Sequence, residues 1–218
     1  MSLSSIPLER VTLRDEASRR LRSEIVSAQL EPATLYPIAE VAQRLGVSIT
    51  PVREALLELA RDGLVEIVRN RGFRIREVTE QDLDEIVHLR LLLEVPTVAG
   101  LAGKLSTEDL ASLRVLAEAT IDAARRGDIP TYLQLDKQFH LELLAHAGSR
   151  RIVETVAKLR DETRLYGLGR LAGTPELIAT TSEHLSLLDA LAKGDAKLAT
   201  ALLTEHLHHA RGVWSQRS

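Results

Sequence analysis

The sequence contains no cysteine, and aromatic residues make up only 3% of its 218 residues. The absence of cysteine excludes disulfide bonds, thiolate nucleophiles and cysteine-ligated metals, and it fits a reducing compartment. No segment approaches the roughly 18 uncharged apolar residues that a membrane span requires. The opening stretch MSLSSIPLER also lacks the basic start and apolar run of a signal peptide. We therefore expect a cytoplasmic protein that does not bind membranes.

The residues that are abundant favour helices. Hydrophobic residues make up 44% of the chain, and Leu, Ala, Glu and Arg dominate the composition. These residue types have high helix propensity and pack through aliphatic faces. A domain takes about 100 to 200 residues, so the length allows one large core or two modest ones. We predict a mainly α protein with two domains.

Near the N-terminus, apolar residues recur at helical spacing in three segments. The first covers residues 13–28. The second covers residues 38–45, after a break at two prolines, and Gly46 ends it. For the third, Ser48 or Thr50 can cap the helix and Pro51 suits its first turn. Its expected buried stripe consists of Val52, Ala55, Leu56, Leu59 and Ala60.

The tight turn at Gly46 and Val47 between the second and third segments is typical of a helix-turn-helix. Residues 65–76 then alternate roughly between apolar and polar on either side of a turn with Asn70 and Gly72 at its tip. Between residues 44 and 76 there are seven arginines against four acids, although the whole chain has a net charge of −3. A basic hairpin at this place indicates a wing, and a local positive charge suits contact with phosphates.

The stretch LGVSITPVREALLELARDGLVE resembles the winged-helix signature of GntR-family transcriptional regulators. The resemblance implies that the third helix is the recognition helix, that Arg53 contacts the operator, that Thr50 contacts phosphate and that the wing tip enters the minor groove. It implies a DNA-binding surface made of Arg44, Ser48, Thr50, Pro51, Arg53, Arg71 and Gly72. The alternative for Arg53 is an ion pair with a nearby acid. The alternative for Gly72 is a purely structural role, because a tight turn favours glycine.

Two residues of the winged-helix part depart from the family pattern. Ile49 stands where the family usually has arginine, and Ile38 stands where it commonly has glutamate. The loss of a guanidinium that could read guanine edges removes about 1 to 3 kcal/mol of base discrimination. The operator sequence is therefore less defined by the resemblance than DNA binding itself.

After residue 78 the sequence is helical throughout. Thr79, Glu80 and Asp82 form a well-charged helix start, so we place the domain boundary at 1–78 and 79–218. Glycine- and proline-containing breaks near residues 103–106, 127–130, 148, 173–175 and 194 divide the C-terminal part into six helical segments. We predict an all-α antiparallel helical bundle.

Asp136 and His140 lie four residues apart, so both side chains lie on one helix face and can reach the same ion. His184 stands in another helix, and the last helix offers His206, His208 and His209, of which His206 is the preferred candidate and His209 the second. Taken singly, each could be an ordinary histidine on a helix surface.

The order DKQFH, EHLSLLDAL and EHL resembles the FCD ligand domain of FadR-type GntR regulators. The resemblance implies a divalent metal held by Asp136, His140, His184 and His206. We expect zinc first, with nickel, manganese or iron as alternatives, because ligand type alone does not choose among them. Arg90 lies on an apolar stripe and needs an anionic partner, which is either Glu94 or the carboxylate of an effector that also binds the metal.

Three functions fit these features. The first is a homodimeric, metal-containing transcription factor, a repressor, that binds a short palindromic operator and responds to a small carboxylate effector. The second is a metal-dependent helical-bundle hydrolase with an accessory DNA-binding module, for which we find no candidate acid or base beyond the metal ligands. The third is a structural DNA-binding protein without an effector. We favour the first and expect no enzymatic activity.

Overall fold

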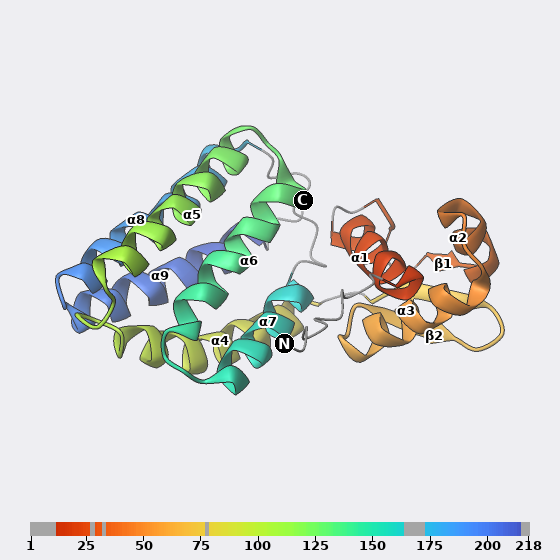
Figure 1. Ribbon diagram of the computed structural model, residues 1–218, viewed down its shortest axis with the longest axis horizontal. Coiled ribbons are helices and arrows are strands. Elements are labelled where there is room, and N and C mark those ends of the chain that lie inside the picture. The colour runs from red at the N-terminus through yellow and green to blue at the C-terminus, as the bar shows by residue number, and fades with distance from the viewer. Residues whose placement is uncertain (1–11, 27–28, 32–33, 77–78, 164–172, 215–218) are drawn as a thin grey trace, which may run out of the picture. The chain divides into compact units, whose positions relative to one another are not determined.

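The computed structural model describes residues 12–26, 29–31, 34–76, 79–163 and 173–214 (Figure 1). The chain divides into two compact units. The first comprises residues 1–25 with 30–76, and the second comprises residues 26–29 with 77–218. Each unit has its own buried residues, and each is described by itself.

The first unit contains α1 (Leu13–Val26), α2 (Ile38–Leu45) and α3 (Ile49–Arg61). Gly46 ends α2 in the left-handed conformation, with φ 69°, so the turn to α3 is as tight as a helix-turn-helix needs. Of the predicted stripe on α3, Val52, Ala55, Leu56 and Leu59 are fully buried. The predicted first helix extends to residue 28, but residues 27–28 lie outside the described residues.

A three-stranded antiparallel sheet completes the first unit. It has the order β1-β3-β2 and consists of β1 (Leu35–Tyr36), β2 (Val65–Val68) and β3 (Gly72–Ile75). Strands β2 and β3 form the predicted wing, with Ile67 opposite Phe73. The alternation prediction is wrong for Ile67, which is 37% exposed, whereas Val65, Phe73 and Ile75 are buried.

The sequence does not predict strand β1, because its segment shows only a break between helices. Leu35 pairs with Arg74, and Tyr36 pairs with Phe73, with which it also makes a ring contact at 5.6 Å between centroids. Gly72 permits this pairing: a Cβ atom there would lie 2.1 Å from the backbone oxygen of Tyr36, and its φ is +144°. The glycine thus allows both an unusual backbone conformation and a close approach between strands.

The second unit is helical throughout its described residues. It contains α4 (Glu80–Ala99), α5 (Thr107–Arg125), α6 (Ile129–Ala145), α7 (Arg150–Thr163), α8 (Pro175–Ala192) and α9 (Ala196–Trp214). The predicted six-helix organisation is therefore confirmed.

Side chains that cap the helix starts explain several of these boundaries. Thr79 accepts a hydrogen bond from the backbone of Asp82, whose carboxylate accepts one in return from the backbone of Thr79. Ser106 and Asp109 form the same reciprocal capping box at α5. Such boxes satisfy amide groups that have no partner within the helix.

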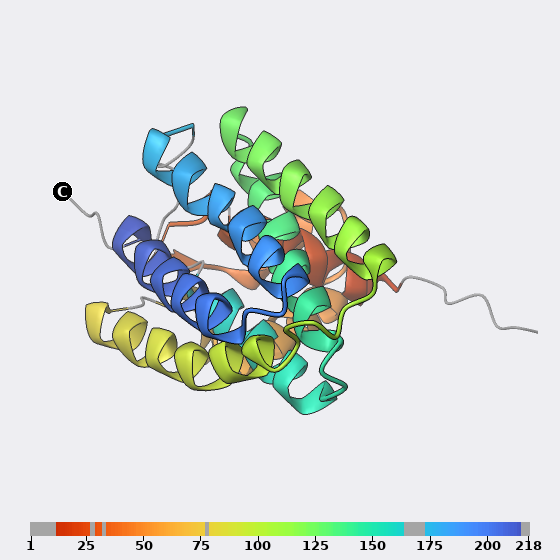
Figure 2. The same cartoon turned by 90° about the vertical axis from the view of Figure 1, so that its left-hand side faces the viewer.

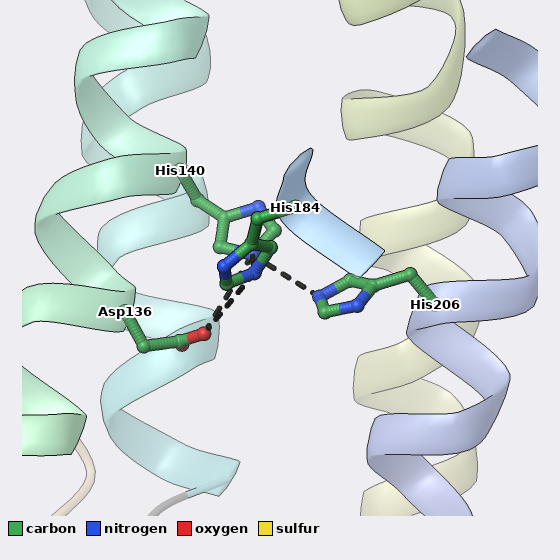
Figure 3. Close-up of side chains that lie close together, drawn as sticks. All are labelled: Asp136, His140, His184 and His206. Carbon is green, nitrogen blue, oxygen red and sulfur yellow. Dashed lines mark hydrogen bonds and ion pairs between the residues drawn. The ribbon is translucent and has the colours of Figure 1, made fainter. Parts of the chain in front are cut away.

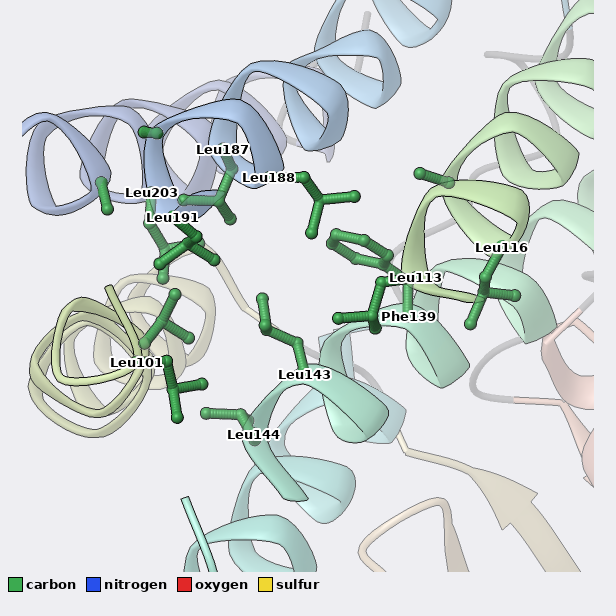
Figure 4. Packing of buried hydrophobic residues seen from close by; sticks show 14 of the residues in the cluster. Leu101, Leu113, Leu116, Phe139, Leu143, Leu144, Leu187, Leu188, Leu191 and Leu203 are labelled. Carbon is green, nitrogen blue, oxygen red and sulfur yellow. The ribbon is translucent and has the colours of Figure 1, made fainter. Parts of the chain in front are cut away.

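The six helices pack around a common interior. Helix α5 packs against α6 and α8, α9 packs against α8 and α4, and α7 packs against α4 and α6. Figure 2 shows α8, α9 and α4 side by side. Apolar residues fill part of this interior, among them Leu113, Phe139, Leu143, Leu188 and Leu203 (Figure 4). Within the described residues, no helix is long and apolar enough to cross a lipid bilayer.

Candidate metal centre and DNA-binding surface

Four side chains from three helices converge inside the second unit (Figure 3). Asp136 and His140 lie one turn apart on α6, His184 lies on α8 and His206 lies on α9. All four are buried, and each offers one ligand atom that lies within 4.8 Å of the others. The structure thus brings together all four residues that the sequence singled out as ligands.

The three imidazoles face one another through the same ring atom. His140 Nε2 lies 3.2 Å from His184 Nε2 and 3.2 Å from His206 Nε2. Asp136 Oδ1 lies 3.5 Å from His184 Nε2 and 3.8 Å from His140 Nε2. Tetrahedral zinc with Zn–N bonds of roughly 2.0–2.1 Å separates its nitrogens by about 3.3 Å. The donor set and its spacing therefore fit a divalent metal.

Burial excludes the alternative that these are histidines of a helix surface. His140 and His184 are each 1% exposed and His206 is 5% exposed. His209, the second candidate of the last helix, has a side chain that is 52% exposed and lies outside the cluster. Among the last helix's candidates, the structure brings His206 to the cluster.

The protonation states suit coordination. Burial, followed by the neighbouring charge of Arg160, lowers the pKa of His140 to about 3. Burial and the nearby His206 and His140 hold the pKa of His184 well below its usual value. Burial raises the pKa of Asp136, but Arg160 and the histidines outweigh it, so the net pKa lies below the usual value. At neutral pH, His140 and His184 are neutral and Asp136 is a carboxylate, which are the forms that bind metals.

Outer residues orient each ligand. Glu94 Oε2 lies 3.4 Å from His140 Nδ1, and Glu183 Oε2 lies 3.0 Å from His206 Nδ1. These contacts leave each Nε2 directed into the cluster. His184 is oriented differently, because its ring stacks on Phe139 at 4.2 Å between centroids. Among the described residues, His184 Nδ1 has no hydrogen-bond partner.

Two buried arginines complete the surroundings. Arg160 donates to Asp136 Oδ2 at 2.9 Å and to Glu94 Oε2 at 3.2 Å. Arg90 is 1% exposed and donates from Nε to Glu94 Oε1 at 2.6 Å. Burial raises the pKa of Glu94, but Arg160 and Arg90 outweigh it and hold the net pKa well below the usual value. Of the two anionic partners that the sequence offered for Arg90, the structure shows Glu94.

Sequence reasoning missed Arg160 and Glu183. Arg160 lies 24 residues from Asp136 and 66 residues from Glu94, so no local spacing relates them. Glu183 directly precedes His184, but its side chain contacts His206 and His209 on α9. The only sequence signal for the role of Glu183 was the pair His206 and His209, three residues apart on the last helix, together with an acid on another helix.

All of the predicted DNA-binding residues belong to the first unit. Arg44, Ser48, Thr50, Arg53 and Arg71 are exposed, Pro51 is half-buried and Gly72 is buried. Ser48 is the N-cap residue of α3 but makes no side-chain capping bond, so the capping prediction is wrong for its side chain. Arg44 donates to Glu24 at 2.5 Å, an ion pair that was not predicted.

A winged helix-turn-helix followed by an all-helical unit is the architecture of a class of transcription factor, and comparison with known proteins places the chain in that class. Residues 13–75 match the family model of bacterial regulatory proteins, gntR family, and residues 85–209 match that of the FCD domain. The chain belongs to the GntR family of transcriptional regulators and carries an FCD domain.

Individual relatives are similar to this chain along most of its length. A probable D-xylose utilization operon transcriptional repressor of Paenarthrobacter nicotinovorans is 30% identical over 211 residues, which are 95% of this chain and 91% of that protein. The regulator McbR of Escherichia coli K12 is 30% identical over 70% of this chain and 69% of its own length. The E. coli McbR/YncC structure has a TM-score of 0.81 at 27% identity, covering 95% and 99% of the two chains.

A second solved structure, a GntR-type regulator from Rhodococcus sp. RHA1, has a TM-score of 0.77 at 25% identity and covers 94% of this chain and 99% of its own. The winged helix and the all-helical C-terminal unit are thus shared features. Because both matched families are regulators, the hydrolase alternative is not supported and the protein is a transcriptional regulator rather than an enzyme.

Proposed function

We propose that the protein is a metal-containing, effector-responsive repressor, in which residues 1–78 bind DNA and residues 79–218 bind metal and effector and form the homodimer. The observation that carries the metal assignment is the buried cluster of Asp136, His140, His184 and His206. The relative from P. nicotinovorans, whose name states a repressor, supports the sign of regulation. A role on cytoplasmic DNA follows from this assignment.

Bound there, a divalent ion supplies a Lewis-acid position to which a small carboxylate can bind. The protein's own residues prepare the site: Arg160 holds one oxygen of Asp136, which leaves Oδ1 directed at the imidazoles. Glu94 and Glu183 hold the outward ring nitrogens of His140 and His206. Zinc remains our first choice, with nickel, manganese or iron as alternatives, because the donor set suits all four.

The operator contact is assigned to Arg44, Ser48, Thr50, Pro51, Arg53, Arg71 and Gly72. Two recognition helices of a homodimer would address half-sites about one DNA turn apart, on a short palindrome. Effector binding in the second unit needs a coupling of only about 1 to 3 kcal/mol to release such an operator.

Metal analysis tests the site directly. Elemental analysis of the purified protein should find about one divalent ion per chain, and Asp136→Ala or His184→Ala should lose it. His208→Ala is the matched control, because His208 is exposed and lies on the same helix as His206. Retention of the metal by both cluster variants would refute the site.

Thermal melting with a panel of organic acids, with and without chelator, tests the effector. A ligand at a hundred times its Kd adds about 2.7 kcal/mol of stability. We expect such a shift for at least one acid and expect chelator to abolish it. An Arg90→Lys variant that keeps its metal but loses the shift would support the effector role of Arg90, which remains a prediction. The third function, a structural DNA-binding protein without an effector, predicts instead that neither chelator nor any acid alters DNA binding in a gel shift.

A further inference from the structure

The exposed face of α3 carries an unusual sequence of side chains. Ile49, Arg53 and Leu57 follow one another at intervals of four residues, so they lie along one face of the helix. Ile49 is 46% exposed and Leu57 is 45% exposed, while the opposite stripe is buried in the unit's core. Two large apolar side chains therefore flank a guanidinium on the face that the core leaves open.

This face borders a hollow of about 520 Å³ between α3 and the wing. Its lining includes Ile49, Leu57 and Ile67 as well as the guanidinium-bearing residues Arg53, Arg69 and Arg71. Ile67 is the exposed residue of β2 that broke the predicted alternation. An apolar lining with three arginines around it is suited to a ligand that is anionic and carries apolar groups.

The arginines of this hollow differ from Arg22 and Arg44 of the same unit. Arg22 pairs with Asp62 and Arg44 pairs with Glu24. By contrast, no described residue forms an ion pair with Arg53, Arg69 or Arg71, although several acids occur nearby in the sequence. Guanidiniums left available in this way complement the phosphates of a nucleic acid, which favours DNA over a protein as the occupant.

Ile49 is placed to meet a base. It is the first residue of α3, and the N-terminal residues of a recognition helix contact base edges in the major groove. Arg53 follows about 6 Å along the axis, a distance comparable to the rise of two base pairs. In the major groove only thymine presents a methyl group, whereas guanine offers the two acceptors that a guanidinium reads.

We propose that Ile49 determines operator specificity by packing on the 5-methyl group of a thymine, close to a base pair that Arg53 reads. The inference rests on the proposed DNA binding by α3. It assigns the departure at position 49 a positive role, namely a preference for thymine where an arginine would select guanine.

The test begins with selection of duplexes from a randomised library by the full-length protein. Each thymine of the selected half-site is then replaced singly by deoxyuridine, which removes only the methyl group, and Kd is measured by fluorescence anisotropy at fixed salt. Burial of one methyl group contributes about 0.8 kcal/mol, so one replacement should weaken wild-type binding about fourfold. The same replacement should leave the Kd of Ile49→Ala unchanged.

Leu57→Ala is the matched control, because Leu57 is equally exposed and lies on the same face two turns further along α3. This variant should keep the wild-type dependence on the methyl group. Selection with Ile49→Arg should enrich guanine where the wild type enriches thymine. If the library enriches no sequence, the proposed operator binding fails. If a sequence is enriched but its affinity does not depend on any methyl group through Ile49, only the present inference is overturned.

Discussion

Nη1 of Arg160 lies 2.9 Å from Oδ2 of Asp136, deep inside the helical unit. The second nitrogen of the same guanidinium, Nη2, lies 3.2 Å from Oε2 of Glu94. One arginine thus donates to two buried carboxylates, one of which belongs to the candidate metal site and the other of which supports His140. The arrangement makes Arg160 a shared support of the ligand set.

Replacement of Arg160 by methionine should therefore destabilise the metal-free protein strongly. Methionine keeps much of the hydrocarbon chain but leaves Asp136 buried without its closest cation. Removal of one partner of a buried ion pair typically costs about 3 to 5 kcal/mol. Urea unfolding in the presence of chelator measures this loss, and Arg160→Lys, which keeps the charge but not the two-pronged geometry, should lose less. A cost below about 1 kcal/mol for Arg160→Met would contradict the assigned role.

Glu183 should affect metal affinity without touching the metal. Its Oε2 lies 3.0 Å from His206 Nδ1, and this contact leaves Nε2 of that ring directed at the cluster. Loss of such outer contacts typically weakens metal binding about 10- to 100-fold. Glu183→Gln should show this loss in a zinc competition titration against a chelator.

Glu205→Gln provides the comparison for Glu183, because Glu205 is an exposed carboxylate of α9 next to His206. It removes the same charge near the same ligand but no contact to the ring. The titration should give wild-type affinity for this variant. Equal losses in both variants would mean that Glu183 acts only through long-range charge.

Local signals in the sequence predicted most of the helices, and they indicated the pair of Asp136 and His140 on one of them. The spacing of Asp136 and His140 depends only on the geometry of one helix, and capping residues such as Ser106 mark helix starts within four residues. The position of His206 on the last helix made it the preferred histidine there, but its combination with Asp136, His140 and His184 came from the resemblance to the FCD domain, because spacing alone cannot relate residues on different helices.

Features that depend on distant contacts were missed. Strand β1 exists because Tyr36 pairs with Phe73, and a two-residue strand leaves no periodic pattern in the sequence. The ion pair of Arg44 with Glu24 likewise joins residues 20 positions apart. Such pairs depend on how the helices pack against one another, and the sequence of a single segment does not determine this packing.

The capping box at α5 offers a prediction about stability alone. The side chain of Ser106 accepts a hydrogen bond from the backbone of Asp109 at 3.1 Å. Ser106→Ala should lower the free energy of unfolding by about 1 kcal/mol, whereas Ser106→Asp, which can also accept this bond, should cost little. Thermal or urea unfolding of both variants measures the difference. Equal stability of Ser106→Ala and wild type would show that the box contributes nothing.

Gly72 and Gly46 allow the role of β1 to be isolated. Both have positive φ, but a Cβ at Gly46 meets nothing within 4 Å, whereas one at Gly72 would overlap the backbone of Tyr36. Gly46→Ala should therefore cost only the backbone term of about 1 to 2 kcal/mol. Gly72→Ala should cost more, because the side chain also forces β1 away from β3.

Hydrogen exchange distinguishes this local effect from a general loss of stability. In Gly72→Ala, the peptide that covers residues 34–37 should exchange faster than in wild type, because its pairing with Phe73 and Arg74 is disrupted. In Gly46→Ala it should exchange at nearly the wild-type rate. Helices α5 and α8 of the other unit provide an internal reference, since neither glycine belongs to that unit. Unchanged protection of residues 34–37 in Gly72→Ala would mean that the wing accommodates the added methyl group without releasing β1.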